Sequence, residues 1–226
     1  MLKTLITLCF VVFAAAAHAQ NESSEAKDKA PPVPRKLNQR AGAESSNAAA
    51  EPFDKATVEE MKTQCVRLET TAGRIELEMF PESAPESVRN FLNLAATGAF
   101  DTTTFSRVVT GFIIQGGNLS TREKMTAELA IRSRRKVPDE PSLIKHERGI
   151  ISMARSEEPN SATTNFFILV SEGWHLDGSF AAFGRVTSGM ETVDAINKMP
   201  VENEKPLKPV RITRATVAVC PVQTEP

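Results

Sequence analysis

The chain has 226 residues and a formal net charge of −1, from 27 Lys and Arg against 28 Asp and Glu. A nearly neutral chain has no overall positive field to draw it to nucleic acid or to an anionic membrane. It also lacks a Walker loop, Gly-x-Gly-x-x-Gly, Cys-x-x-Cys and Gly-x-Ser-x-Gly, and it keeps only two histidines beyond residue 19, so we expect no metal site and no cofactor.

The first 19 residues have the layout of a secretory signal peptide. Lys3 precedes an apolar run over Leu5–Ala17, and Ala17-His18-Ala19 is a small-x-small cleavage site. The run is shorter than the roughly 20 residues needed to span a bilayer. We therefore expect residues 1–19 to be removed after Ala19, and the mature protein to be periplasmic or secreted and free of a membrane anchor.

Residues 20–62 are rich in Ala, Glu, Ser, Asn, Lys and Pro, with very few large apolar side chains. Such a segment buries too little surface to offset the entropy cost of ordering, so it predicts a flexible linker. A short helix at Thr57–Thr63 is the alternative for its last residues. Residues 63–222 have the length of one domain with a single core, and residues 223–226 form a short tail.

The folded domain is expected to begin with two strands and a helix. Alternating apolar side chains over Cys65–Phe80, interrupted by a turn at Gly73, predict a hairpin of two half-buried strands. Ser83-x-x-Glu86 has the pattern of a capping box. The apolar residues behind it recur at helical spacing, so we expect a helix that ends at Gly98.

Strands dominate the rest of the domain. A second capping box, Ser188-x-x-Glu191, and Pro200 bound the only other predicted helix. The basic run Arg132–Lys136 is predicted to be a solvated loop rather than a polyanion site. Many short strands with two helices favour a β-barrel or sandwich over a doubly wound sheet. The remaining predicted strands are Phe105–Gln115, Gly149–Ala154, Asn165–Val170, Ala181–Val186 and Arg211–Cys220.

Two cysteines remain after cleavage, Cys65 and Cys220. In an oxidising compartment an even pair far apart in sequence favours a disulfide, the alternative being two separate thiols. The strand alternation places Cys65 on the face of Arg67 and Cys220 on the face of Arg214, which is the outer face. If the first and last strands are neighbours, a disulfide would close a loop of about 155 residues and stabilise the fold by about 4–5 kcal/mol.

The segment Phe105–Asn118 carries an arginine and a glutamine, Arg107 and Gln115, among aromatic, aliphatic and glycine residues. It resembles the signature of the cyclophilins, Phe-x-Arg-Val-x-x-Gly-Phe-x-x-Gln-Gly-Gly. The resemblance covers about Val66–Val219 and implies a closed eight-stranded antiparallel barrel capped by two α-helices. It continues in order and spacing through Gly149–Ala154, Asn165–Ile168, Leu176–Gly178 and Phe183–Val186.

The resemblance implies a monomeric peptidyl-prolyl cis-trans isomerase that acts on proline-containing segments of exported proteins. Arg107 would be the catalytic residue, and Gln115 would align the peptide backbone of the substrate. The other implied substrate-binding residues are Phe112, Ile113, Phe167 and Leu176 around the proline ring, Ala154, Arg155 and Asn165 along the groove, and His175 and Phe180 at its edge.

Some positions depart from the pattern of the family. His175 stands where cyclosporin-sensitive members have tryptophan, and Phe180 stands where histidine or tyrosine is frequent. Ser106 and Thr110 replace a frequent histidine and proline beside the arginine. Because Arg107 is retained, the resemblance implies isomerase activity with altered substrate preference and weak cyclosporin binding.

These residue types suit the reaction. Rotation about an X-Pro amide is opposed by about 18–20 kcal/mol, because the nitrogen shares its lone pair with the carbonyl group. No covalent bond breaks, so the reaction needs no nucleophile, and an arginine N–H can donate to the nitrogen as it becomes pyramidal. Two alternatives remain: a non-catalytic module that holds proline-bearing chains as a chaperone, and a passive structural domain.

Overall fold

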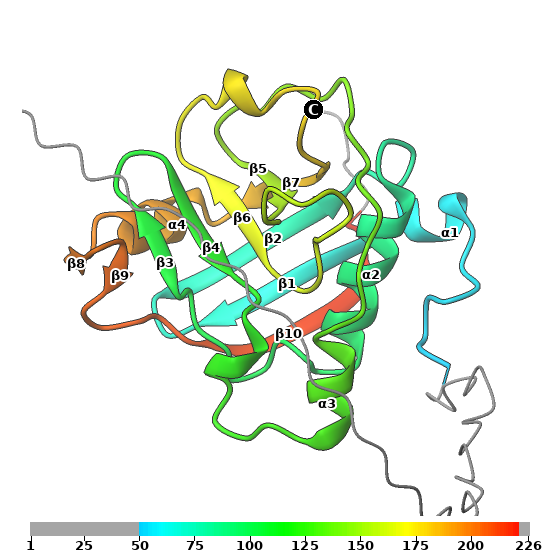
Figure 1. Cartoon of the computed structure of the whole chain (residues 1–226), viewed down its shortest axis with the longest axis horizontal. Helices are drawn as coiled ribbons and strands as arrows, with labels where there is room; N and C mark the ends of the chain where they lie inside the picture. Colours follow the sequence, from blue (N-terminus) through cyan, green and yellow to red (C-terminus); the bar gives the residue numbers. More distant parts are fainter. Residues whose placement is uncertain (1–49, 222–226) are drawn as a thin grey trace, which may run out of the picture. The chain divides into compact units, whose positions relative to one another are not determined.

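The computed structural model describes residues 50–221, so the predicted signal peptide, residues 20–49 of the predicted linker and the predicted tail lie outside the described residues. Within this range the chain is mainly β (Figure 1). The sheet contains β1 (Gln64–Thr70), β2 (Gly73–Met79), β3 (Arg107–Val109), β4 (Ile113–Gly116), β5 (Ile150–Met153), β6 (Phe166–Leu169), β7 (Ala182–Ser188) and β10 (Ile212–Val219).

The eight strands are all antiparallel and follow the order β10-β1-β2-β7-β5-β6-β4-β3. The sheet curls around an apolar core (Figure 1). Four helices accompany it, rather than two: α1 (Val58–Lys62), α2 (Pro85–Ala96), α3 (Ala127–Arg132) and α4 (Met190–Asn197). The longest, α2, contacts β10 and β7, whereas α4 contacts β2, β3 and β4, and both helices contribute buried residues to the core.

The expectation of a closed barrel is wrong for this structure. The edge strands β3 and β10 share no ladder, and the two edges meet only through the isolated bridge between Thr104 and Arg211 and the backbone hydrogen bonds around it. The reason lies at β3, which has three residues and whose outer edge is already occupied. There the amide of Val108 donates to the carbonyl oxygen of Glu204 at 2.8 Å, in a small hairpin of β8 (Val201–Glu202) and β9 (Lys205–Pro206).

The predicted first hairpin is confirmed. Strands β1 and β2 pair with Thr70 opposite Gly73 and Leu68 opposite Ile75. The apolar members of the alternation are at most 5% exposed and face the core, while the charged members lie on the other side. A period of two residues places alternate side chains on opposite faces of a strand. The alternation in the sequence was therefore sufficient to predict this hairpin.

The predicted single strand over Phe105–Gln115 is instead two strands, β3 and β4, joined by a tight turn. Gly111 has a φ of 76°, and the amide of Phe112 donates to the carbonyl oxygen of Val109 at 2.9 Å. The glycine permits this left-handed backbone, which lets the chain reverse. The turn makes Arg107 and Gln115 direct cross-strand partners, a closer arrangement than one strand would allow.

Neither predicted capping box forms. Helix α2 begins at Pro85 behind Ala84, which makes no side-chain cap. Glu140, distant in sequence, supplies the missing acceptors: its carboxylate accepts from the amides of Glu86 at 2.9 Å and Ser87 at 2.8 Å. At α4 the cap residue is Gly189, with a φ of 92°, and the preceding serine remains in strand β7.

The predicted linker ends too late in the chain, because residues 50–62 pack against the domain. Met61, on α1, is fully buried, and Phe53 packs against the core. The basic run is not merely a solvated loop either: Arg132 is 12% exposed and pairs with Glu51 at 2.6 Å, and Arg135 contacts the same carboxylate at 3.1 Å. The low apolar content of residues 20–62 did not indicate that Phe53 and Met61 pack against the domain, or that Glu51 pairs with two arginines.

Cys65 and Cys220, the pair predicted above, are joined by a disulfide across a sequence separation of 155. Cys65 lies on β1, and Cys220 directly follows the neighbouring strand β10, where its amide donates to the carbonyl oxygen of Thr63 at 2.9 Å. The bond therefore joins the first and the last strand of the chain, which are neighbours in the sheet. Within residues 50–221, no helix has the length and apolar character needed to cross a membrane.

Candidate active site

A second apolar cluster lies apart from the main core. Its buried members are Ile113, Ile150, Phe167, Leu169 and Ala182. Half-buried side chains packed against it are Phe80, Val109, Phe112, Ile144, Ala154, Leu176 and Phe180. Six of the predicted substrate-binding residues belong to this cluster, so the fold brings the predicted proline pocket together from β4, β5, β6 and the loops that follow them.

Strand alternation explains why these residues leave the main core. Directly opposite residues of an antiparallel pair share a face. Ile113 lies opposite Leu169 and Gln115 opposite Phe167, so these four side chains are on one face of β4 and β6. The intervening residues, such as Ile114, belong to the main core instead. One short sheet segment therefore supports both clusters.

Arg107 stands at the edge of this face. It lies opposite Gln115, which lies opposite Phe167, so the three residues occupy adjacent positions on β3, β4 and β6. The Arg107 side chain is 45% exposed, and its guanidinium is not turned into the core. Nη1 donates to Gln115 Oε1 at 3.3 Å, and Nε donates to Glu204 Oε2 at 2.7 Å. A cation thus stands beside the apolar cluster, on a strand two positions away from that of Phe167.

Aromatic side chains form the edge of the cluster. His175 stacks on Phe112 with ring centroids 5.4 Å apart, and Trp174, which is 76% exposed, meets His175 edge-on at 6.1 Å. Phe180 meets Phe167 edge-on at 6.0 Å. The predicted pocket is therefore bounded by rings on two sides, and Trp174 was not predicted to be part of this edge.

Arg155 lies against the outer side of the cluster. Its guanidinium carbon is 4.8 Å from the ring centre of Phe180, and its terminal nitrogens donate to the carbonyl oxygens of Ser156 and Ser179. These contacts make Arg155 a support for Phe180. The side chain of Asn165 is not in the cluster. The backbone carbonyl oxygen of Asn165 accepts from the amide of Ala154 at 3.0 Å, which places Asn165 next to the cluster.

The turn that carries Phe112 is held from α4 by a buried amide that the sequence did not single out. Asn197 Oδ1 accepts from the amide of Gly111 at 2.7 Å. Its Nδ2 donates to the carbonyl oxygens of Val109 and Ile113, both at 2.9 Å. Asn197 thereby pairs three backbone groups of this tight turn, which fixes the turn relative to α4.

His146, Asp177 and Ser152 form a hydrogen-bonded network beside Phe167, the cross-strand partner of Ser152. Asp177 Oδ1 accepts from the amide of His146 at 2.8 Å and lies 3.1 Å from Nδ1, while Nε2 lies 3.2 Å from Ser152 Oγ. Burial lowers the pKa of His146, against the opposing effect of Asp177, so the ring is neutral at pH 7. The His146 amide, more than any other contact, lowers the pKa of Asp177 to about 2.

This Ser-His-Asp arrangement is not a nucleophilic triad. Ser152 is fully buried, and its hydroxyl also contacts the carbonyl oxygen of Ala181 at 2.8 Å. A nucleophile must reach its substrate, which a fully buried hydroxyl cannot do. Ser152 lies opposite Phe167 and therefore on the same face, so the network instead packs beside the apolar cluster and supports Phe167 from the side. No sequence pattern indicated this network, because His146, Ser152 and Asp177 together form no recognisable motif.

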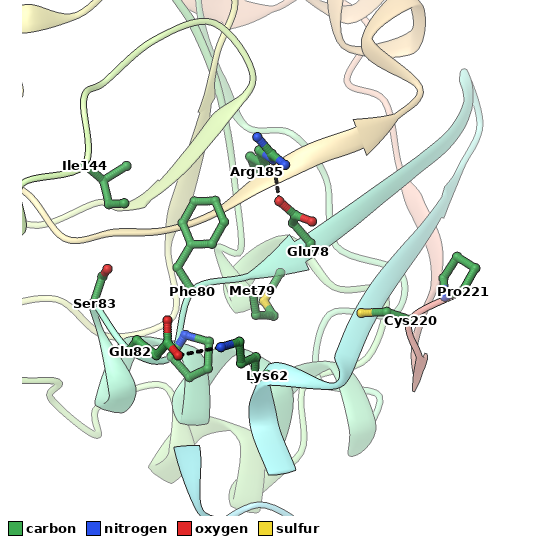
Figure 2. Close-up of a pocket in the computed structure, with 11 residues that line it drawn as sticks. Lys62, Glu78, Met79, Phe80, Glu82, Ser83, Ile144, Arg185, Cys220 and Pro221 are labelled. Atoms are coloured by element: carbon green, nitrogen blue, oxygen red, sulfur yellow. Dashed lines mark hydrogen bonds and ion pairs between the residues drawn. The ribbon is translucent and has the colours of Figure 1, made fainter. Parts of the chain in front are cut away.

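The cavity shown in Figure 2 lies elsewhere, near the disulfide, and has a volume of about 460 Å³. Its walls include the ion pairs Lys62–Glu82 and Arg185–Glu78, and only Phe80 and Ile144 connect it with the apolar cluster. None of the predicted substrate-binding residues lines it. Within residues 50–221, no group of three or more His, Cys, Asp or Glu side chains is placed to hold a metal ion.

Comparison with known proteins is consistent with this geometry. Residues 65–217 match the family model for cyclophilin type peptidyl-prolyl cis-trans isomerases. Peptidyl-prolyl cis-trans isomerase A of Dickeya dadantii is 38% identical over 163 residues, covering 67% of this chain and 83% of that protein. Peptidyl-prolyl cis-trans isomerase cypE of Dictyostelium discoideum is 39% identical over 158 residues, covering 69% of this chain and 99% of that protein.

A solved structure is also similar. It is a cyclophilin type peptidyl-prolyl cis-trans isomerase of Cryptosporidium parvum, determined in the presence of the dipeptide Ala-Pro. It superposes with a TM-score of 0.60 at 30% identity, covering 69% of this chain and 99% of that one.

Proposed function

Because the chain belongs to the family of cyclophilin-type peptidyl-prolyl cis-trans isomerases, we propose that it accelerates rotation about X-Pro bonds in exported proteins and so assists their folding. The isomerase activity follows from membership of the family. That the substrates are exported proteins is the additional part of the proposal. The secretory pattern of residues 1–19 and the Cys65–Cys220 disulfide, a bond typical of oxidising compartments, support that step.

The observation that carries the proposal is the row of Arg107, Gln115 and Phe167 beside the apolar cluster. We propose that the cluster takes the proline ring, with Phe167 and Ile113 beneath it and Phe112 and Leu176 at its sides. Gln115 Nε2 is left to donate to a substrate carbonyl oxygen, since its Oε1 accepts from Arg107. The ring would then be held while the rest of the peptide turns.

The chemistry requires only a donor that strengthens its contact in the twisted amide. In the planar ground state the proline nitrogen is a poor acceptor, but it regains its lone pair as the amide twists. An N–H of Arg107 pointing at that nitrogen therefore stabilises the transition state more than the substrate. A thousandfold acceleration needs about 4 kcal/mol, which a charge-assisted hydrogen bond beside an apolar surface can supply.

The test is exchange spectroscopy by NMR on an Ala-Pro peptide, with Kd measured separately by titration. We expect Arg107→Ala to lower the exchange rate of the bound peptide by about 10²–10³-fold and to leave Kd within about threefold. Arg107→Lys should recover little, because the flexible ammonium group lacks the planar guanidinium donors. A wild-type protein that binds the peptide without accelerating exchange would instead indicate the non-catalytic chaperone module.

Cyclosporin sensitivity gives an independent prediction. We propose weak binding, because His175 covers Phe112 where sensitive members have an indole. Calorimetry should give a micromolar or weaker Kd for the wild type, and His175→Trp should tighten it by at least about tenfold, since an indole adds apolar contact area. Nanomolar binding by the wild type would contradict this role for position 175.

We further propose that the protein acts as a monomer in the periplasm or outside the cell after cleavage behind Ala19, without a nucleic-acid or membrane partner. Its near-neutral charge and the pattern of residues 1–19 support this. Amino-terminal sequencing of the exported protein would test the cleavage site directly.

A further inference from the structure

The turn of the β8–β9 hairpin contains a residue in an unfavourable backbone conformation. Asn203 and Glu204, the two residues between the strands, have φ values of 49° and 62°. A two-residue hairpin turn with both φ values positive strongly prefers Asn-Gly. Asn203 meets this preference, but glutamate is disfavoured in the left-handed region. Backbone strain of this kind clusters at functional sites, where the surrounding structure holds it in place.

The backbone of this turn is docked on β3, one residue from Arg107. The amide of Val108 donates to the carbonyl oxygen of Glu204 at 2.8 Å, and β9 lies beside β3 (Figure 1). This docking sets the Glu204 side chain toward the guanidinium, whose Nε donates to Glu204 Oε2 at 2.7 Å. The strained residue is therefore the one that contacts the catalytic cation.

The contact orients the guanidinium without covering it. Glu204 holds Nε and Gln115 holds Nη1, so the plane of the group is fixed from two sides. Across residues 50–221, Nη2 makes no hydrogen bond, which leaves it as a donor for a substrate. The Arg107 and Glu204 side chains are 45% and 49% exposed, and pairs this exposed contribute little to stability. Stability alone therefore does not explain a glutamate here.

We propose that Glu204 is a positioning residue that holds Arg107 in the orientation needed for catalysis. The inference rests on the proposed function, because it assigns Glu204 a role only if Arg107 acts on the substrate. A free arginine side chain samples many rotamers, and holding it in one of them before the substrate arrives lowers the cost of reaching the transition state. Loss of Glu204 should therefore slow the catalysed step more than it weakens binding.

The experiment uses four variants of the full chain in the NMR exchange assay: Glu204→Gly, Glu204→Gln, Asn203→Gly and Arg107→Ala. We expect Glu204→Gly to lower the exchange rate about tenfold with Kd within about twofold, while the thermal midpoint stays equal or rises, because glycine fits the turn. Glu204→Gln, which keeps a neutral acceptor, should recover part of the rate. Asn203→Gly, the matched control in the same turn, should leave rate and midpoint unchanged.

The outcomes separate the possible roles. A rate for Glu204→Gly equal to that of the wild type overturns the inference, and a higher rate shows that Glu204 competes with the substrate for Arg107. A rate that falls together with the thermal midpoint indicates a merely structural role and also overturns it. If Arg107→Ala keeps the wild-type rate, the proposed catalytic role of Arg107 fails, independently of Glu204.

Discussion

The ionisation of one buried side chain, His146, makes the stability of the domain depend on pH. His146 is 1% exposed, contacts Ser152 next to Phe167, and is neutral at pH 7 because burial lowers its pKa. In the neutral ring, Nδ1–H donates a hydrogen bond to Asp177. Nε2 accepts from the Ser152 hydroxyl, whose single proton is shared between Nε2 and the carbonyl oxygen of Ala181. Protonation of the His146 ring would place a buried positive charge next to the apolar cluster.

We therefore expect the free energy of unfolding to fall as the pH is lowered below about 6.5, because the unfolded chain binds a proton there more readily than the folded chain. The slope from His146 cannot exceed about 1.4 kcal/mol per pH unit. The carboxyl of Asp177, with a pKa of about 2, adds a contribution that is present above pH 3.8 and lost toward about pH 2. Urea unfolding at several pH values measures both.

The control for the histidine is His146→Gln, which keeps the size and polarity but does not titrate. Its free energy of unfolding at pH 7 should be lower than that of the wild type, and its pH dependence between about pH 7 and about pH 5 should be flatter. Identical slopes for the two proteins would show that other groups dominate this range.

Among the helices and strands, the beginning of α2 depends on a residue far away in the sequence. The Glu140 carboxylate accepts from the amides of Glu86 and Ser87 and from the Ser87 hydroxyl. We expect Glu140→Ala to lower the free energy of unfolding by about 1–2 kcal/mol, the typical cost of losing a helix cap with a favourable negative charge. Glu140→Gln should lose about half as much.

The matched control is Glu157→Ala, which removes an exposed carboxylate that makes no hydrogen bond or ion pair in the described part of the chain. Its free energy of unfolding should stay within about 0.5 kcal/mol of the wild type. Equal effects of the two alanine substitutions would mean that net charge, and not capping, is responsible.

Local patterns predicted some elements better than others. The β1–β2 hairpin follows from alternation, and α2 follows from helical spacing, because both signals lie within the element itself. The predicted strand over Phe105–Gln115 misses the β3–β4 turn, because Thr110-Gly111 is a short interruption between two β-branched and aromatic runs. The first capping box failed because Glu140, distant in sequence, supplies the acceptors at α2. The second failed because Ser188 remains in β7 and Gly189 takes the cap position of α4.

In the candidate site, too, residues that belong to a local sequence pattern were predicted, and residues that come from distant segments were not. The family signature identified Arg107, Gln115 and the apolar residues of the cluster, and the strand register brings them together. Glu204 and Asn197 were not predicted, because they reach the site from segments 97 and 86 residues away. No spacing along the sequence encodes such contacts; they depend on how the hairpin and α4 pack.

For the molecule as a whole, the disulfide is the main covalent restraint. It closes a loop with a sequence separation of 155, which restricts the unfolded chain far more than the folded one. We expect the double variant Cys65→Ser/Cys220→Ser to lose about 2–5 kcal/mol of unfolding free energy in urea. Exchange activity at room temperature should be kept, because neither sulfur lies in the apolar cluster.

Adding a reducing agent to the wild type should lower its stability to that of the double variant, and adding it to the variant should change nothing. Equal stability of the oxidised wild type and the variant would show that the disulfide adds no restraint beyond that of the β1–β10 pairing.

The position of this bond also determines how the domain responds to mechanical load. Cys65 opens the first sheet strand and Cys220 follows the last, so a pull applied at Thr63 and Pro221 passes through the two sulfur atoms. The residues between them bear almost no tension while the bond is intact. A pulling force on the two ends therefore leaves the arrangement of Arg107 and the apolar cluster unchanged.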